Sequence, residues 1–134
     1  MTTYIITPPT SLQAHIQLPA SKSISNRALI IHALSGGDIV PRNLSDCDDT
    51  AVMIHALRDM PAEIDIKAAG TAMRFMTAYL ACTGGTHTLT GTERMKKRPI
   101  RILVNALRYL GADIQYLGEE GFPPLLINGK TIEG

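Results

Sequence analysis

The stretch LPASKSISNRALIIHAL, residues 18–34, carries the signals that decide the fold around it. Pro19 ends the preceding segment, and Ser21 or Ser23 can cap a helix, because a serine oxygen accepts hydrogen bonds from the free N–H groups of a first turn. Apolar residues at helical spacing follow, and a glycine pair stops the pattern. The stretch therefore predicts a helix from about residue 23 to residue 34.

The segments on either side of this helix predict alternating strands and helices. On its N-terminal side, apolar and polar residues alternate from Leu12 to Leu18, as in a half-buried strand. Thr71 can cap a later helix, and Pro99 is expected at the first position of another. Beyond residue 34 we expect, in order, a strand at 38–40, a helix opened by Asp48 and Asp49, a strand at 63–67, a helix at 71–82, a strand at 86–90, a helix at 99–110, and strands at 113–116 and 125–128.

This order of elements contains an internal repeat. The glycine pairs that begin at 36 and 84 lie 48 residues apart, the Ala-Leu-Arg triplets that begin at 56 and 106 lie 50 apart, and Arg27 and Arg74 occupy equivalent places. One unit has too little apolar surface to be stable alone. We therefore expect a mixed α and β fold of about two stacked units, 12–67 and 68–128.

Composition limits the class of protein. The chain of 134 residues is long enough for one domain, and its net charge of +1 gives no global field that would gather nucleic acid or an anionic membrane. Cys47 and Cys82 lack the spacing of a zinc site, so reduced thiols and no metal are expected. Without a targeting signal or a long apolar run, the expectation is a soluble, cytoplasmic protein that does not bind membranes.

Cationic side chains gather where the first helix begins. Ser23 and Arg27 lie four residues apart and share one helical face, and Lys22 stands beside them. A helix N-terminus already carries partial positive charge, so added cations favour a bound anion there. The simpler alternative is a capping serine, a solvated lysine and an arginine in an intrahelical ion pair.

The same arrangement recurs twice. In AAGTAMR, Gly70 permits close backbone approach, Thr71 can cap, and Arg74 follows on the same face. ERMKKRPI places a basic run that ends at Arg98 immediately ahead of a helix, and solvated lysines explain Lys96 and Lys97 better than Arg98. Three cationic helix N-termini indicate one pocket for a ligand with several negative groups, such as phosphate and carboxylate.

The basic run could instead meet RNA, but it has no interleaved aromatic residue for base stacking and the chain is nearly neutral, so we expect no nucleic acid partner. The acidic pair Asp48 and Asp49 most simply stabilises a helix N-terminus, and a site role for Asp49 is the second interpretation.

Three motifs in order, LPASKSISNRAL, AGTAMR and LTGTERMKKRPI followed by NALRYLGADIQYL, resemble the signature series of the 5-enolpyruvylshikimate-3-phosphate synthase family. The resemblance runs from about Leu12 to Asn128. It implies the enolpyruvyl transferase (alpha-beta prism) fold, built from βαβαββ units, of which this chain holds about two.

The resemblance also implies an activity. Family members transfer the enolpyruvyl group from phosphoenolpyruvate to the 5-hydroxyl of shikimate 3-phosphate and release phosphate, on the route to chorismate and aromatic amino acids. They need no metal or organic cofactor, are expected to be cytoplasmic monomers, and are the target of glyphosate. The implied partners are therefore shikimate 3-phosphate and phosphoenolpyruvate.

Residue by residue, the resemblance assigns binding roles. Lys22, Ser23 and Arg27 match shikimate 3-phosphate contacts, and Lys22 also reaches phosphoenolpyruvate together with Gly70 and Arg98. Thr71 and Arg74 match motif positions of less defined role. The sequence departs from the family at Ala20, where Gly is frequent, at Ala68, where Asn commonly stands, and at Phe75, where Pro often follows the arginine.

The family's chain is much longer than this one, with two domains of three units each. We therefore expect an N-terminal fragment that is inactive alone and can self-associate, with the catalytic acid and base beyond Gly134 and no catalytic residue within it. Two alternatives are an enolpyruvyl transferase acting on UDP-N-acetylglucosamine, whose Lys-Asn and Cys-loop patterns this sequence lacks, and a related module that binds RNA ends.

Overall fold

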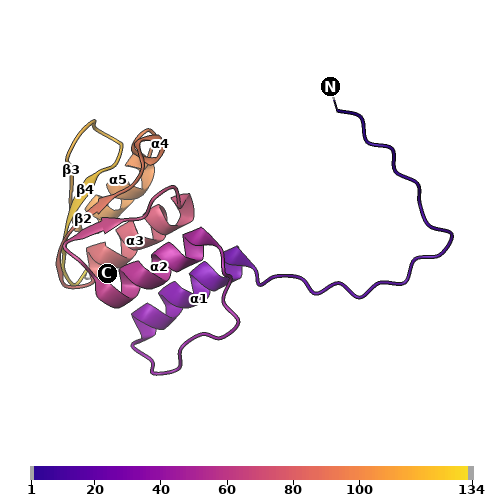
Figure 1. The fold of residues 1–134 in the computed structure, drawn as a ribbon. Helices are drawn as coiled ribbons and strands as arrows, with labels where there is room; N and C mark the ends of the chain where they lie inside the picture. Colours follow the sequence, from indigo (N-terminus) through magenta and orange to yellow (C-terminus); the bar gives the residue numbers. More distant parts are fainter. Residues whose placement is uncertain (1, 133–134) are drawn as a thin grey trace.

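Residues 2–132 are described by the computed structural model, in which a four-stranded sheet carries helices on one face (Figure 1). The elements, in chain order, are α1 (Lys22–Ser35), α2 (Asp48–Asp59), β1 (Glu63–Asp65), α3 (Gly70–Cys82), β2 (Gly85–Thr90), α4 (Glu93–Lys96), α5 (Arg101–Tyr109), β3 (Asp113–Tyr116) and β4 (Leu125–Gly129). The expected mixed α and β class is confirmed.

The sheet has the strand order β1-β2-β4-β3. Strands β1 and β2 run parallel, with Ile64 opposite Leu89, whereas β4 runs antiparallel to both β2 and β3. Parallel neighbours need a crossover connection, which α3 supplies between β1 and β2. As a result, the chain leaves β1 and β2 at the same edge of the sheet.

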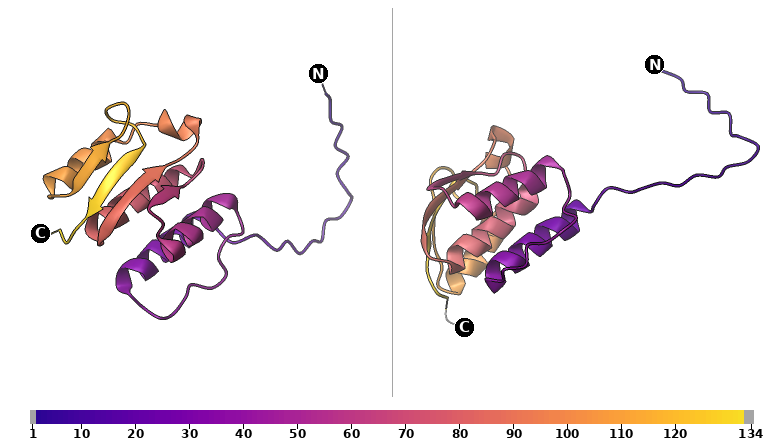
Figure 2. Two further views of the ribbon diagram at one scale, coloured as in Figure 1. Left: turned by 60° about the vertical axis from the view of Figure 1, so that its left-hand side comes forward. Right: turned by 60° about the horizontal axis from the view of Figure 1, so that its bottom comes forward.

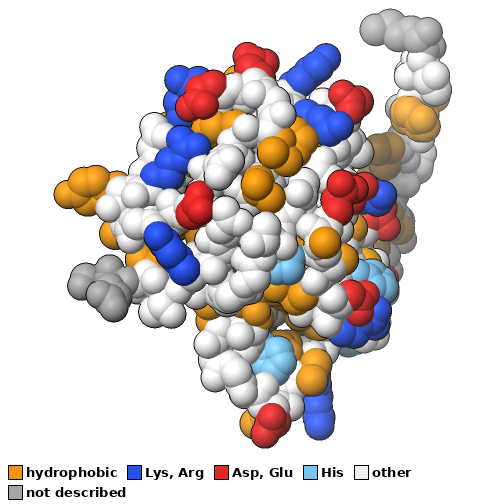
Figure 3. Space-filling view, turned by 90° about the vertical axis from the view of Figure 1, so that its left-hand side faces the viewer, with side chains coloured by type: hydrophobic (Ala, Val, Ile, Leu, Met, Phe, Trp, Pro, Cys, Tyr) orange, Lys and Arg blue, Asp and Glu red, His pale blue; other side chains and the backbone are white. Residues whose placement is uncertain are grey.

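The core lies between α3 and the sheet. Alternate residues of β4, Leu125 and Ile127, are fully buried with Leu89 of β2, and they belong to one cluster with Met76 and Leu80 of α3. The other face of the sheet carries outward threonines of β2, and Figure 3 shows acidic and basic side chains interspersed over this side of the molecule. Among the described residues, therefore, only the face of the sheet that packs against α3 contributes to the core.

Helices α1, α2 and α3 lie side by side and point the same way (Figures 1 and 2). Ser21 caps α1, because its Oγ accepts from the Ile24 N–H at 3.4 Å, and Gly36 ends it in the left-handed conformation at φ 62°. Both signals were predicted from the sequence, and the prediction of this helix is confirmed.

Two predicted strands are wrong. Residues 12–18 and 38–40 form no strand, and the side chains of Leu12, Ile16 and Leu18 are 84%, 76% and 79% exposed. Residues 2–20 run away from the folded body (Figure 1). Alternation describes a strand that one face will bury, but a strand also needs a neighbouring strand to take its backbone hydrogen bonds, and neither segment pairs with a strand among the described residues.

The region around the basic run also differs from expectation. Thr92 caps an unexpected short helix, α4, through the Met95 N–H at 3.3 Å, so the run does not lead straight into α5. Helix α5 begins at Arg101 instead of Pro99, because the Ile100 N–H donates to the Gly121 carbonyl at 2.9 Å. Thr71 does not cap α3, whose N-cap is Ala69.

The division into units 12–67 and 68–128 stays a prediction. Strand β1 falls in the first interval but pairs with β2 of the second, so the two intervals share one sheet.

Candidate anion-binding site

The N-termini of α1, α2 and α3 meet the carboxyl ends of β1 and β2 at one end of the molecule, which we call the helix-N-terminal end (Figure 1). In sheets with parallel strands, ligands bind at the carboxyl ends of the strands. Helix N-termini add free N–H groups and partial positive charge, which favour anions. The backbone alone therefore prepares this end for a negatively charged ligand.

The two loops at this end are locked to each other. Lys67 follows β1 with φ 52°, and the Asp65 carboxylate holds it by accepting from its N–H at 2.8 Å and from its Nζ at 2.7 Å. The ion pair lowers the pKa of Asp65. The Lys67 carbonyl accepts from the Thr92 N–H at 3.1 Å, and a Cβ on Gly91 would lie 2.6 Å from that carbonyl oxygen. Only glycine lets the loop after β2 approach so closely.

Arg98 lies over the first residue of α3. A Cβ built on Gly70 would lie 2.6 Å from Arg98 Cζ and 2.8 Å from its Nη2, which is closer than side-chain atoms approach. Glycine at this position therefore makes room for the guanidinium. The sequence placed Arg98 ahead of α5, whereas the structure brings it to the N-terminus of α3, because α4 redirects the chain.

A depression of about 450 Å³ opens beside this contact, lined by Ala68, Arg94, Met95 and Arg98. Within residues 2–132, neither guanidinium has a hydrogen bond or an ion pair. The acid nearest in sequence, Glu93, pairs with Lys96 at 2.8 Å, and this pair lowers the pKa of Glu93 and raises that of Lys96. Two unneutralised arginines thus face a hollow at a helix N-terminus.

A second depression, of about 360 Å³, shares Ala68 with the first and also contains Asp49. Asp49 Oδ2 lies 3.0 Å from Lys22 Nζ, and this hydrogen bond raises the pKa of Lys22. Ser23 stands next to Lys22 with an exposed side chain. Lys22, Ser23 and Asp49 therefore lie along the same end of the molecule as Gly70 and Arg98.

Ala68 replaces the asparagine that is common in the resembled family, and it lies where the two depressions meet. The side chain is exposed. Ala68 therefore places a methyl group, instead of the carboxamide of an asparagine, beside Arg94 and Arg98.

Arg27 and Arg74 are equivalent in structure as well as in sequence. Each guanidinium donates to the carbonyl four residues earlier, Arg27 to Ser23 at 3.0 Å and Arg74 to Gly70 at 3.1 Å. Arg27 also lies over the Phe75 ring at 5.8 Å, and Arg74 donates to the Pro99 carbonyl at 3.5 Å. These bonds go to neutral carbonyls, so both cations keep their charge available to an anion.

Thr71, the remaining residue that the sequence singled out, lies half-buried in the first turn of α3 without a capping bond. Arg94 was seen only as part of the basic run. Its spacing of four residues from Arg98 was the signal that could have placed both beside one hollow.

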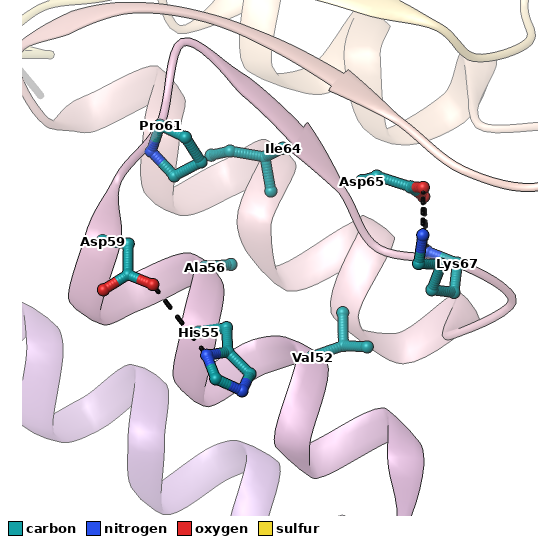
Figure 4. Close-up of a pocket in the computed structure, with 8 residues that line it drawn as sticks. All are labelled: Val52, His55, Ala56, Asp59, Pro61, Ile64, Asp65 and Lys67. Atoms are coloured by element: carbon teal, nitrogen blue, oxygen red, sulfur yellow. Dashed lines mark hydrogen bonds and ion pairs between the residues drawn. The ribbon is translucent and has the colours of Figure 1, made fainter.

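A third pocket, of about 230 Å³, lies between α2 and β1 (Figure 4). Its charged groups already have partners, since Lys67 pairs with Asp65 at 2.7 Å and His55 Nδ1 lies 3.9 Å from Asp59 Oδ2. Arg58 holds the same aspartate at 2.8 Å and lowers the pKa of Asp59. With its charges neutralised internally, this pocket has no free group for a ligand.

Among residues 2–132, no group of three or more His, Cys, Asp or Glu side chains could hold a metal ion, and no helix is long and apolar enough to cross a membrane.

Comparison with known proteins gives a consistent picture. The sequence matches the family described as EPSP synthase (3-phosphoshikimate 1-carboxyvinyltransferase) over residues 6–65 and 60–134. A 3-phosphoshikimate 1-carboxyvinyltransferase of Bacteroides fragilis is 68% identical over 131 residues, which is 98% of this chain and 32% of the relative. One of Cellvibrio japonicus is 43% identical over 95% of this chain and 35% of the relative.

Solved structures agree with the fold. An EPSP synthase of Acinetobacter baumannii superposes with a TM-score of 0.73 and 25% identity, covering 85% of this chain and 32% of that one. The chain thus spans about a third of the length of the relatives it matches. Its matched residues cover nearly the whole sequence, and the chain therefore belongs to the EPSP synthase family.

Proposed function

We propose that this chain supplies one wall of an active site that transfers the enolpyruvyl group from phosphoenolpyruvate to the 5-hydroxyl of shikimate 3-phosphate and releases phosphate. The observation that carries the proposal is the Arg98 guanidinium over Gly70, without an acidic partner in the described residues, at the N-terminus of α3. The relatives named for this activity support the choice of substrates.

The two substrates bind next to each other along the helix-N-terminal end, each at its own set of residues. Arg98 and the Gly70 N–H take an anionic group of phosphoenolpyruvate, Ser23 and Arg27 contact shikimate 3-phosphate, and Lys22 reaches both. Arg74 supports this arrangement by tying α3 to the segment before α5. Two anions that repel each other in water are brought together because fixed cations offset their charge.

In the reaction, the substrate hydroxyl oxygen bonds to C2 of phosphoenolpyruvate, and the bond from C2 to the phosphate oxygen then breaks. Charge moves onto the departing phosphate, and preorganised cations stabilise it more in the transition state than in the ground state. Lys22 and Arg98 are cations of this kind. The proton transfers are assigned to groups outside this chain.

Because the chain spans a third of its relatives, the activity is best tested in a chimera, in which this chain replaces the matching third of the Bacteroides fragilis relative. We expect the chimera to release phosphate when both substrates are present, and the isolated chain to release none. An inactive but folded chimera would contradict the proposed activity.

Within the chimera, Arg98→Ala and Arg27→Ala should lower kcat/KM by about 100-fold or more, because each removes a charged hydrogen bond to substrate. Arg58→Ala is the matched control, since Arg58 is an exposed arginine in the last turn of α2, bonded to Asp59. Equal losses in all three variants, or wild-type kinetics in Arg98→Ala, would count against the assignment.

The remaining expectations are part of the same proposal: a cytoplasmic enzyme, monomeric when its site is whole, and without affinity for nucleic acid or membranes.

A further inference from the structure

Ser25 and Asn26 belong to the motif that begins the first helix, but the proposed function gives neither a role. Both are buried, with Ser25 3% and Asn26 0% exposed. They lie three and four residues after Lys22 and so share its side of α1. Their polar groups therefore face a buried junction one turn below the Lys22 ammonium.

That junction joins α1 to the start of α2. The Ser45 N–H donates to Ser25 Oγ at 2.8 Å, and Ser25 Oγ donates to the Ser21 carbonyl at 2.9 Å. At the next residue of α1, Asn26, the side-chain Oδ1 accepts from the Thr50 hydroxyl at 3.0 Å, and Thr50 is 0% exposed. We call Ser25, Asn26, Ser45 and Thr50 the α1/α2 seam.

The seam ends at Lys22 itself. Thr50 follows Asp49 in the first turn of α2, and Asp49 Oδ2 holds Lys22 Nζ at 3.0 Å. The exposed ion pair and the buried hydrogen bonds thus join the same two turns. An exposed lysine alone keeps considerable rotamer freedom, and an ion pair at the surface restrains it only weakly.

Asn26 carries a cost that needs a reason. Its Nδ2 is buried and has no hydrogen-bond partner within residues 2–132. Buried polar groups are almost always bonded, and an apolar side chain would pack at this position without an unpaired N–H. Its amide oxygen, which accepts from Thr50, is what an apolar side chain could not supply.

We infer that Asn26 and Thr50 are positioning residues that hold the first turns of α1 and α2 in register, so that Lys22 and Asp49 meet and the Lys22 ammonium is presented to the substrates. The inference rests on the proposed function for its kinetic consequence. Its structural consequence, an ordered Lys22 side chain, does not depend on any activity.

Thr50→Val tests the inference, because valine has the shape of threonine but cannot donate to Asn26. Thr50→Ser restores the hydroxyl. Thr77→Val is the matched control, since Thr77 is also 0% exposed and its hydroxyl bonds within α3, to the Met73 carbonyl at 2.7 Å. Ser25→Ala gives a second, independent break of the seam should Thr50→Val fail to fold.

In the chimera, Thr50→Val should lower kcat/KM about fivefold or more, with kcat itself falling, because a displaced Lys22 stabilises the transition state less. Thr50→Ser and Thr77→Val should stay within about twofold of the parent, although Thr77→Val lowers the melting temperature as well. An unchanged kcat/KM in Thr50→Val, or an equal fall in Thr77→Val, would overturn the inference.

In the isolated chain, NMR relaxation of the Lys22 Cε methylene reports its order directly. We expect Thr50→Val and Ser25→Ala to increase its mobility, and Thr77→Val to leave it unchanged. If the parent chimera is inactive, the proposed function is wrong, but this measurement still decides whether the α1/α2 seam orders the Lys22 side chain. A Lys22 side chain that is equally ordered in Thr50→Val would refute the positioning role.

Discussion

At the scale of single residues, the site shows how surroundings give one residue type different tasks. Arg27 and Arg74 both donate to carbonyls of their own helices, whereas Arg98 has no protein partner in the described residues and lies over Gly70. A guanidinium that satisfies itself on its helix is held in place, and one without a partner is free to bind an anion. Gly70 is the residue that lets the Arg98 guanidinium lie against the N-terminus of α3.

Gly70→Ala should therefore weaken anion binding without unfolding the protein. Gly70 opens α3 with an ordinary helical backbone, so alanine fits the helix, but its Cβ would displace the Arg98 guanidinium. In the chimera we expect KM for phosphoenolpyruvate to rise about tenfold, which corresponds to one charged hydrogen bond. Gly84→Ala, where a Cβ meets no atom within 4 Å, is the control and should change nothing.

At the scale of elements, caps and turns place the helix N-termini. Gly36 ends α1 in the left-handed conformation, and the chain then returns through residues 37–47 to start α2 beside the start of α1. The ion pair between Asp65 and Lys67 holds the turn that leads from β1 into α3. Each device fixes where a following helix begins, and so where its free N–H groups point.

Gly36→Ala should destabilise the chain by about 1 kcal/mol, because a side chain in the left-handed region strains the backbone. No atom lies within 4 Å of the added Cβ, so the loss would report backbone strain alone. Urea unfolding would measure it, with Gly84→Ala as the unstrained comparison. Equal stability of the two variants would contradict the cap assignment.

Asp65→Asn should show a pH-dependent loss of stability. The pKa of Asp65 is lowered by Lys67, so its contribution is present above the ordinary aspartate value and is lost as pH falls through the lowered one. At pH 7 we expect a loss of about 0.5 kcal/mol, as for a partly exposed pair. Once the pH has fallen below that lowered pKa, the variant and the parent should converge.

Urea unfolding at several pH values checks this expectation, and Asp38→Asn serves as the control, because Asp38 is exposed and has no ion pair in residues 2–132. A difference between Asp65→Asn and the parent that does not change with pH would mean that the loss is not electrostatic.

At the scale of the whole molecule, the chain exposes much apolar surface. Ile24 and Ile31 lie seven residues apart on one side of α1 and are 71% and 66% exposed, and Ile102 and Tyr109 do the same on α5 at 89% and 92%. Soluble monomers seldom leave such helix faces uncovered. The segments 12–18 and 38–40, which form no strand, expose further apolar side chains, among them Leu12, Ile16 and Ile39.

The isolated chain should therefore self-associate. We expect sedimentation velocity to show a weight-average mass that rises with concentration above that of the monomer. Ile24→Asn together with Ile31→Asn should reduce the association, and Ile102→Asn would show whether α5 takes part. A chain that stays monomeric at high concentration would contradict this expectation.

By itself the sequence determined the helices and strands that local signals define, the family, and the residue types of an anion site. Ser21, Gly36 and the apolar spacing between them act within one element, so α1 could be predicted, as could β3 and β4. The three motifs identify the family because their order and spacing can be recognised in the sequence without knowing which residues are in contact.

Only the tertiary structure decided which of these residues meet. The alternation at 12–18 looked like a strand, but pairing depends on a neighbour that local sequence does not reveal. The order of elements placed the basic run ahead of α5, and only the family resemblance grouped Arg98 with Gly70. The structure gives the physical reason, because α4 and the crossover between β1 and β2 bring the two together across 28 residues. The α1/α2 seam could not be predicted for the same reason, since the hydrogen bond between Thr50 and Asn26 follows from packing and leaves no pattern in the sequence.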